Sequence, residues 1–165
     1  MATPTNLPAT VNTGDNATAT WANDIRGAFR ILQVVSASTA TAWSSSSSTY
    51  AAITNVTVDI TPQATSSKIF VVVSLAGAFK STNNTSLDVE LRRGTTTIQT
   101  ASSNFNTATT ATNAGTVVIT YLDSPATTAL RTYAVRGRSS ANLATVGTNA
   151  LGTSDSSITV FEVSA

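Results

Sequence analysis

Alternation between apolar and polar residues runs through most of the chain from residue 31 onward, and this period of two is typical of half-buried β-strands. It is clearest in residues 87–92 (LDVELR), where three apolar side chains alternate with Asp88, Glu90 and Arg92. Glycine, proline, serine and asparagine clusters interrupt the alternation and indicate turns. The pattern predicts about eight strands, centred on residues 31–37, 53–60, 68–75, 87–92, 95–101, 116–122, 131–138 and 157–163, with a weaker one within 139–149.

The centre of the sheet is predicted in residues 116–138 (TVVITYLDSPATTALRTYAVRGR). Its two strands are separated by Asp123, Ser124 and Pro125, which favour a turn, so we expect a hairpin in which Asp123 bonds to its own backbone. The first of these strands and residues 68–75 (KIFVVVSL) are apolar on both faces. Strands of that kind are usually buried twice, and we therefore expect both of their faces to be covered.

The order of the elements predicts the fold class. No helical pattern lies between the strands, so residues 31–165 are expected to form an all-β domain, a jelly-roll-like antiparallel β-sandwich. Residues 1–30 are expected to form an extended arm and one short helix, because Trp21, Ile25 and Phe29 have the i, i+4, i+8 spacing of one apolar stripe. A helix this short is marginal alone and has to dock on something.

Two docking sites remain open for this helix. It could close one end of its own sandwich, or it could dock with the arm on a neighbouring subunit or another protein. In the second case the residues expected to bind a capsid protein or other partner are Leu7, Val11, Trp21, Ile25 and Phe29.

The amino-acid composition excludes several classes of function. Serine and threonine make up roughly a third of the chain, far above average usage, whereas only 10% of residues are charged and the net charge is +1. Lysine and arginine are too few for a nucleic-acid-binding face. The chain has no cysteine and no histidine, so thiolate ligands and the commonest general base are missing. We expect no enzymatic activity, catalytic residue, metal site or cofactor.

The N-terminal residues Met1, Ala2, Thr3 and Pro4 lack the basic start and apolar run of a signal peptide, and no window has the apolar length of a membrane span. We expect a chain that begins at Met1, does not enter a membrane and assembles in a cytoplasm. Neither heptads nor collagen-like triplets predict a fibrous shaft.

The charged residues of the strands allow more than one interpretation. Asp88 and Glu90 point the same way and could in principle serve glycoside hydrolysis or hold a cation, but Arg92 on the same face favours a row of ion pairs. The neighbouring arginines form either a solvated face or contacts between subunits. For the second reading, the predicted subunit-interface residues are Asp88, Glu90, Arg92, Arg131 and Arg136. Strands that are apolar on both faces also favour assembly, which a closed homotrimer would provide.

Three stretches resemble a known family. Residues 11–32 (VNTGDNATATWANDIRGAFRIL), 119–128 (ITYLDSPATT) and the terminal SITVFEV are similar to small virion structural proteins of tailed bacteriophages, including marine and cyanobacterial ones. Such proteins are described as decoration (cement) or tail-fibre-like proteins. The resemblance covers most of the chain and implies a trimeric β-domain on a phage particle, located in the virion and without a catalytic motif.

Two functions follow from this resemblance. The first is a homotrimeric capsid decoration protein that bridges and stabilises capsid subunits, with itself and the major capsid protein or another virion protein as partners. The second is a tail-fibre or head-fibre knob that binds the host surface through the loops 43–50, 81–86 and 102–114. A secreted lectin-like module is a third class, but it lacks a signal peptide and aromatic sugar platforms.

Overall fold

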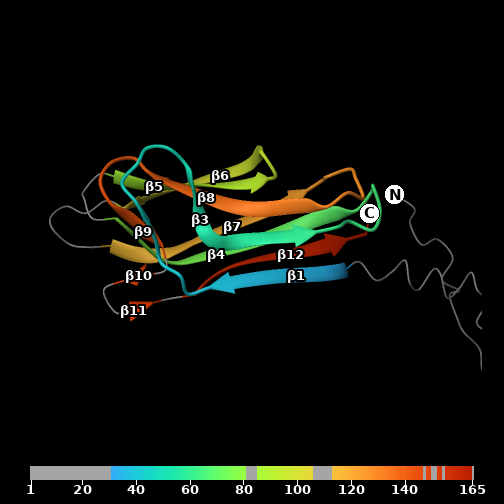
Figure 1. The fold of residues 1–165 in the computed structure, drawn as a ribbon, viewed down its shortest axis with the longest axis horizontal. Coiled ribbons are helices and arrows are strands. Elements are labelled where there is room, and N and C mark those ends of the chain that lie inside the picture. The colour runs from blue at the N-terminus through green and yellow to red at the C-terminus, as the bar shows by residue number, and fades with distance from the viewer. Residues whose placement is uncertain are drawn as a thin grey trace, which may run out of the picture.

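The computed structural model describes residues 31–80, 85–105, 113–146, 148–149, 152–153 and 155–164. The arm and helix predicted within residues 1–30 lie outside these residues. The described chain is all-β, and it contains eight long strands and four strands of two or three residues (Figure 1). The prediction of an all-β sandwich with about eight main strands is confirmed.

The strands have the following bounds: β1 (Ile31–Thr39), β2 (Trp43–Ser45), β3 (Ala51–Ile60), β4 (Lys68–Lys80), β5 (Thr85–Arg93), β6 (Thr96–Phe105), β7 (Asn113–Asp123), β8 (Arg131–Ser139), β9 (Ala144–Val146), β10 (Thr148–Asn149), β11 (Gly152–Thr153) and β12 (Ser156–Val163). Sheet A contains β1, β12, β4, β9 and β2 in this order, and β7 also pairs with β4. Sheet B has the order β3, β8, β5, β6. All pairings in both sheets are antiparallel, and the sheets lie over each other as two layers (Figure 1).

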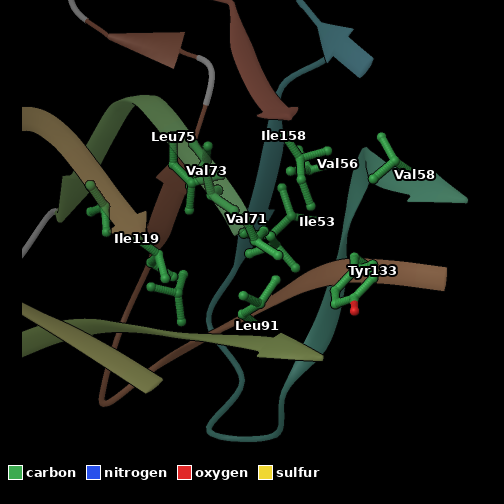
Figure 2. Close-up of a cluster of buried hydrophobic side chains, with 14 of the residues drawn as sticks. Ile53, Val56, Val58, Val71, Val73, Leu75, Leu91, Ile119, Tyr133 and Ile158 are labelled. Atoms are coloured by element: carbon green, nitrogen blue, oxygen red, sulfur yellow. The ribbon is translucent and has the colours of Figure 1, made fainter. Parts of the chain in front are cut away.

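The core lies between the two sheets and is filled by the inward residues that the alternation predicts. Val71 and Val73 of β4 face Leu91 of β5 and Tyr133 of β8 across the sandwich (Figure 2). Burying each such side chain contributes about 1.5–3 kcal/mol relative to leaving it exposed. In β12 the same alternation buries Ile158 and Val160.

The hairpin predicted for residues 116–138 is wrong. β7 pairs with β4 in sheet A, whereas β8 pairs with β3 and β5 in sheet B. The residues from Ser124 to Leu130 therefore carry the chain from one sheet to the other. A turn signal between two strands fits a crossover between layers as well as a hairpin, and only the long-range pairing of each strand decides between them.

The expectation that β4 and β7 are covered on both faces is also wrong for the single chain. Their inward side chains are buried, but on the outward side Phe70 is 37% exposed and Leu122 is 57% exposed. Other local predictions are confirmed: β5 and β6 form a hairpin in which Gly94 takes the positive φ of 57°. Sheet A thus has one buried apolar face and one exposed face that is partly apolar.

Candidate functional site

A row of ion pairs crosses the outer face of sheet B. Arg138 Nε donates to Asp88 Oδ2 at 3.0 Å, and Arg136 donates to Glu90 Oε1 at 3.2 Å. These pairs are cross-strand neighbours, since Asp88 is opposite Arg138 and Glu90 is opposite Arg136 in the β5–β8 register. Both carboxylates are buried although they point away from the core.

Neighbouring side chains cover this row. The ring of Tyr50 lies 4.7 Å from the guanidinium of Arg138, a cation–π contact, and Arg136 also donates to the Tyr50 carbonyl. Thr97 of β6 donates to Glu90 at 2.8 Å. Burial acts to raise the pKa of Asp88, but hydrogen bonds from serine side chains and from Arg138 outweigh it and lower that pKa. The row is therefore satisfied by its own chain.

The structure brings together four of the five residues predicted for a subunit interface. Arg92 Nε lies 3.9 Å from Glu90, beside the Arg136 pair, whereas Arg131 begins β8 opposite Ile60 and shares the inward side of that strand with Tyr133. Their role in a subunit contact stays a prediction. The charge partners that such a contact would supply to Asp88 and Glu90 are already present within the chain.

Asp123 connects the two sheets at one end of the sandwich. Arg93 of β5 donates to its carboxylate at 2.7 Å, and the hydroxyl of Tyr133 in β8 donates to Oδ2 at 2.6 Å. Asp123 lies at the end of β7 and is 5% exposed. Burial and the bond to Asp123 raise the pKa of Tyr133 far above its ordinary range. The carboxylate that was expected to cap its own turn instead holds β5, β7 and β8 together.

Glu162 is a second buried carboxylate with a structural role. Its oxygens accept from Gln33 Nε2 at 2.6 Å and from the backbone amide of Gln63 at 2.7 Å. Burial acts to raise the pKa of Glu162, but polar groups of Ser67 and Gln33 and the backbone amides of Gln63 and Ala64 outweigh it and the pKa is lowered. Glu162 thereby ties β12 to β1 and to the connection that follows β3.

Lys80 is the one basic residue that is buried among the residues that the structure describes. Its ammonium group donates to Ser139 Oγ and to the carbonyl of Ala141, at the turn that follows β8. Burial lowers the pKa of Lys80. The lysine therefore closes this turn, and each of the five buried charged residues of the described chain has polar partners from the chain itself.

The outer face of sheet A has a different character. The β-ladder places Val34, Phe161, Phe70 and Leu122 side by side in one row across β1, β12, β4 and β7. The rings of Phe70 and Phe161 lie 6.1 Å apart. We call the outward side of these four strands the apolar face; its large hydrophobic members are Ile31, Val34, Phe70, Val72, Val118, Leu122, Phe161 and Val163.

The sequence carried a signal for this face, but not its place in the fold. Apolar residues on both sides of β4 and β7 predict an extra apolar surface that is covered on both faces, and they also favour assembly of subunits. Tyr133, Glu162 and Lys80 had no such signal, because their partners lie 10 or more residues away in the sequence. The arm residues Leu7, Val11, Trp21, Ile25 and Phe29 fall outside the described residues.

The described part of the chain lacks two features, a metal-ligand cluster and a membrane-spanning helix. No group of three or more acidic, histidine or cysteine residues there could hold a metal ion. Nor do the described residues include a helix that could cross a membrane.

Comparisons with known proteins give fold likenesses alone. No family model and no curated protein matches the chain. The structure is similar to an Eiger TNF from S. frugiperda, at 9% identity and a TM-score of 0.38 over 80% of this chain and 94% of that chain. It is also similar to VP2 of infectious bursal disease virus in a subviral particle, at 15% identity and a TM-score of 0.41 over 82% of this chain and 39% of VP2. A second structure of that virus, the Gt strain, gives 15% identity and a TM-score of 0.37 over 81% of this chain and 38% of that chain. At these scores we draw no functional conclusion from the likenesses.

Proposed function

We propose that this protein is a non-enzymatic structural protein of a bacteriophage virion, a homotrimeric capsid decoration protein that bridges and stabilises capsid subunits. The observation that carries the proposal is the contrast between the two sheets. The buried charged side chains of the sandwich have polar partners within the chain, whereas the outer face of sheet A leaves apolar side chains exposed. An exposed apolar surface of this kind is typical of a domain that binds other proteins.

The internal bonds support a mechanical role. Asp123 joins strands of both sheets, and Glu162 ties β12 to β1 and to the connection after β3. Buried, hydrogen-bonded ionic groups of this kind favour one arrangement of the strands over others. A protein that bridges capsid subunits against internal pressure needs a domain that keeps its shape.

The position of the N-terminal segment supports the proposed attachment. Thirty residues precede β1, and the stretch 11–32 carries the resemblance to phage virion proteins. In this proposal the sandwich projects from the particle, and the segment with Leu7, Val11, Trp21, Ile25 and Phe29 binds the capsid protein.

Removal of residues 1–30 tests this attachment. The wild-type chain and the truncated chain are each mixed with capsid shells that lack the protein, and the shells are sedimented. We expect the wild type to co-sediment and the truncated chain to stay in the supernatant with a far-ultraviolet circular dichroism spectrum that keeps the β signal of the sandwich. Trp21→Ala within the full chain is the finer variant, and it should weaken binding in the same assay. A folded truncated chain that still binds the shells would refute the attachment.

The alternative is a head-fibre or tail-fibre knob that binds the host surface. It is favoured by the segment 43–50, which begins with β2 and continues as a loop. Trp43 is buried and the ring of Tyr50 lies over Arg138, so the exposed serines between them are held at both ends. A knob of this kind should bind host cells, and replacing the exposed residues Ser46 and Ser48 by lysine should abolish that binding without affecting attachment to shells.

A further inference from the structure

We propose that the apolar face of sheet A is the surface through which copies of this chain associate with one another. The inference takes from the proposed function the idea that the protein is a homotrimer. It adds the surface through which the subunits contact one another. It starts from a concentration of exposed apolar side chains. Of the seven large hydrophobic residues that are exposed in the described chain, five lie on this face: Ile31, Val34, Phe70, Val118 and Leu122.

The register makes the face continuous. Val34 is opposite Phe161, Phe161 is opposite Phe70, and Phe70 is opposite Leu122, so four strands contribute one apolar row. Strands lie about 4.8 Å apart and rise about 3.3 Å per residue, so the face from Lys68 to Ser74 measures roughly 14 Å by 20 Å between backbone atoms. This is roughly 280 Å² of flat area. It is about a third of the roughly 800 Å² per partner that a standard protein–protein contact buries, so the face has the size of the centre of such a contact.

The row on one side of the apolar row carries hydroxyl groups, whereas the row on the other side carries Ile31, Val163 and Lys68. Ser36, Thr159 and Thr120 flank Val72 in the first of these rows, and Ser36 and Thr159 share a hydrogen bond of 2.8 Å. Hydroxyl groups can donate and accept, so they can bond to identical groups of another copy. An apolar centre with a neutral polar rim is the usual organisation of a subunit contact.

The lack of charge on the apolar face favours another copy of this chain as the protein that binds it. Among the outward residues of the four strands within this face, Lys68 is the one charged side chain; it lies at the end of the face, and its ammonium donates to Ser124 at 2.8 Å. A nucleic acid or a strongly charged protein would find no complementary charge there. Identical neutral faces meet without like-charge repulsion, and symmetry brings the same surface of every copy to one axis.

The test introduces a charge into the apolar row. Leu122→Glu is compared with Leu130→Glu, a matched control in which an equally exposed leucine lies outside the face, at 58% against 57% exposure. Sedimentation velocity of the full chains over a concentration series gives their mass. We expect the wild type and Leu130→Glu to form the same oligomer, and Leu122→Glu to dissociate with a dissociation constant raised at least about 100-fold.

A second variant guards against misfolding. Val34→Glu places the same charge on β1 at the other end of the row, and circular dichroism identifies which variants keep the β spectrum. Any folded variant of the two that keeps the wild-type oligomer overturns the inference, as does a wild type that is monomeric throughout. These measurements use the isolated protein, so their failure is distinct from a failure to bind shells.

Labelling distinguishes other occupants of the face. The chain has no cysteine, so Val118→Cys and Leu130→Cys each introduce a single reporter for a maleimide. In the oligomer we expect Val118→Cys to react slowly and to become fast on dilution, whereas Leu130→Cys stays fast. Slow labelling of Val118→Cys in a monomer, relieved by removal of residues 1–30, would assign the face to the chain's own N-terminal segment and overturn the inference.

Discussion

Tyr133 illustrates how a single residue contributes to the fold. Its ring is fully buried in the core, and its hydroxyl donates to Asp123 at 2.6 Å. We expect Tyr133→Phe to lower the free energy of unfolding at pH 7 by about 1–3 kcal/mol, because Asp123 loses a hydrogen-bond donor in a buried site. Urea unfolding measures this loss, and Tyr121→Phe, on β7 rather than β8, serves as a control for removing a phenolic hydroxyl at another position.

The same tyrosine predicts a dependence on alkaline pH. Its pKa is raised in the folded chain, so its contribution to stability is fully present below pH 10.0, the ordinary value, and is lost as the pH rises above it. The loss is at most about 1.4 kcal/mol per pH unit. Unfolding measured between pH 9 and pH 11 should show a steeper fall for the wild type than for Tyr133→Phe. Parallel curves for the two proteins would contradict the burial of the neutral hydroxyl.

Gly137 gives a prediction based on space. A Cβ at this position would lie 2.8 Å from the indole of Trp43, which is too close for either group. Gly137→Ala should therefore destabilise the fold by about 1–3 kcal/mol through overpacking. At Gly94 a Cβ meets nothing within 4 Å, and only the φ of 57° opposes a side chain, so Gly94→Ala should cost about 1–2 kcal/mol. Near-ultraviolet circular dichroism of Trp43 should change in Gly137→Ala and not in Gly94→Ala.

At the scale of elements, Glu162 connects β12 with β1 and with the connection after β3. Its pKa is lowered in the folded chain, so its contribution is present above the ordinary value of 4.5 and is lost as the pH falls through the folded pKa. We expect Glu162→Gln to cost about 1–3 kcal/mol at pH 7. When the pH is lowered from 5 to 3, the free energy of unfolding of Glu162→Gln should fall less than that of the wild type. Equal losses on acidification would show that other carboxylates dominate in this range.

The strands themselves were predictable and their partners were not. Alternation identified the inward side of β5, because period two follows from the geometry of any strand. In β12 it separated Ile158 and Val160 from Phe161 and Val163, but it did not show which pair faces the core. It could not show that β7 and β8 belong to different sheets, since pairing depends on residues far away in the chain. For the same reason Asp123 was assigned to its turn, although Arg93 lies 30 residues before it in the sequence.

For the candidate surfaces too, the sequence predicts which residues share a face but not what those residues contact. The sequence placed Asp88 and Glu90 together and predicted an ion-pair row, and the structure adds that Arg136 and Arg138 of the same chain provide the partners. Apolar residues on both sides of β4 and β7 were correctly recognised. Which of those sides remains exposed depends on how the two sheets stack, and this is a property of the whole sandwich.

At the scale of the whole molecule, the sandwich gives its buried charged side chains polar partners within the chain, and we propose that its one exposed apolar face binds copies of itself. The N-terminal segment then remains for the contact with the particle. This division assigns subunit association and attachment to different parts of the chain, so variants of Leu122 and the removal of residues 1–30 should fail in different assays.

The most direct test is the position of the protein on purified particles, determined by electron microscopy with symmetric reconstruction. We expect trimers repeated over the whole shell, each at a place where capsid subunits meet. In each trimer, sheet A should face the threefold axis. Copies confined to the tail or to a few vertices would contradict the decoration function and support a fibre.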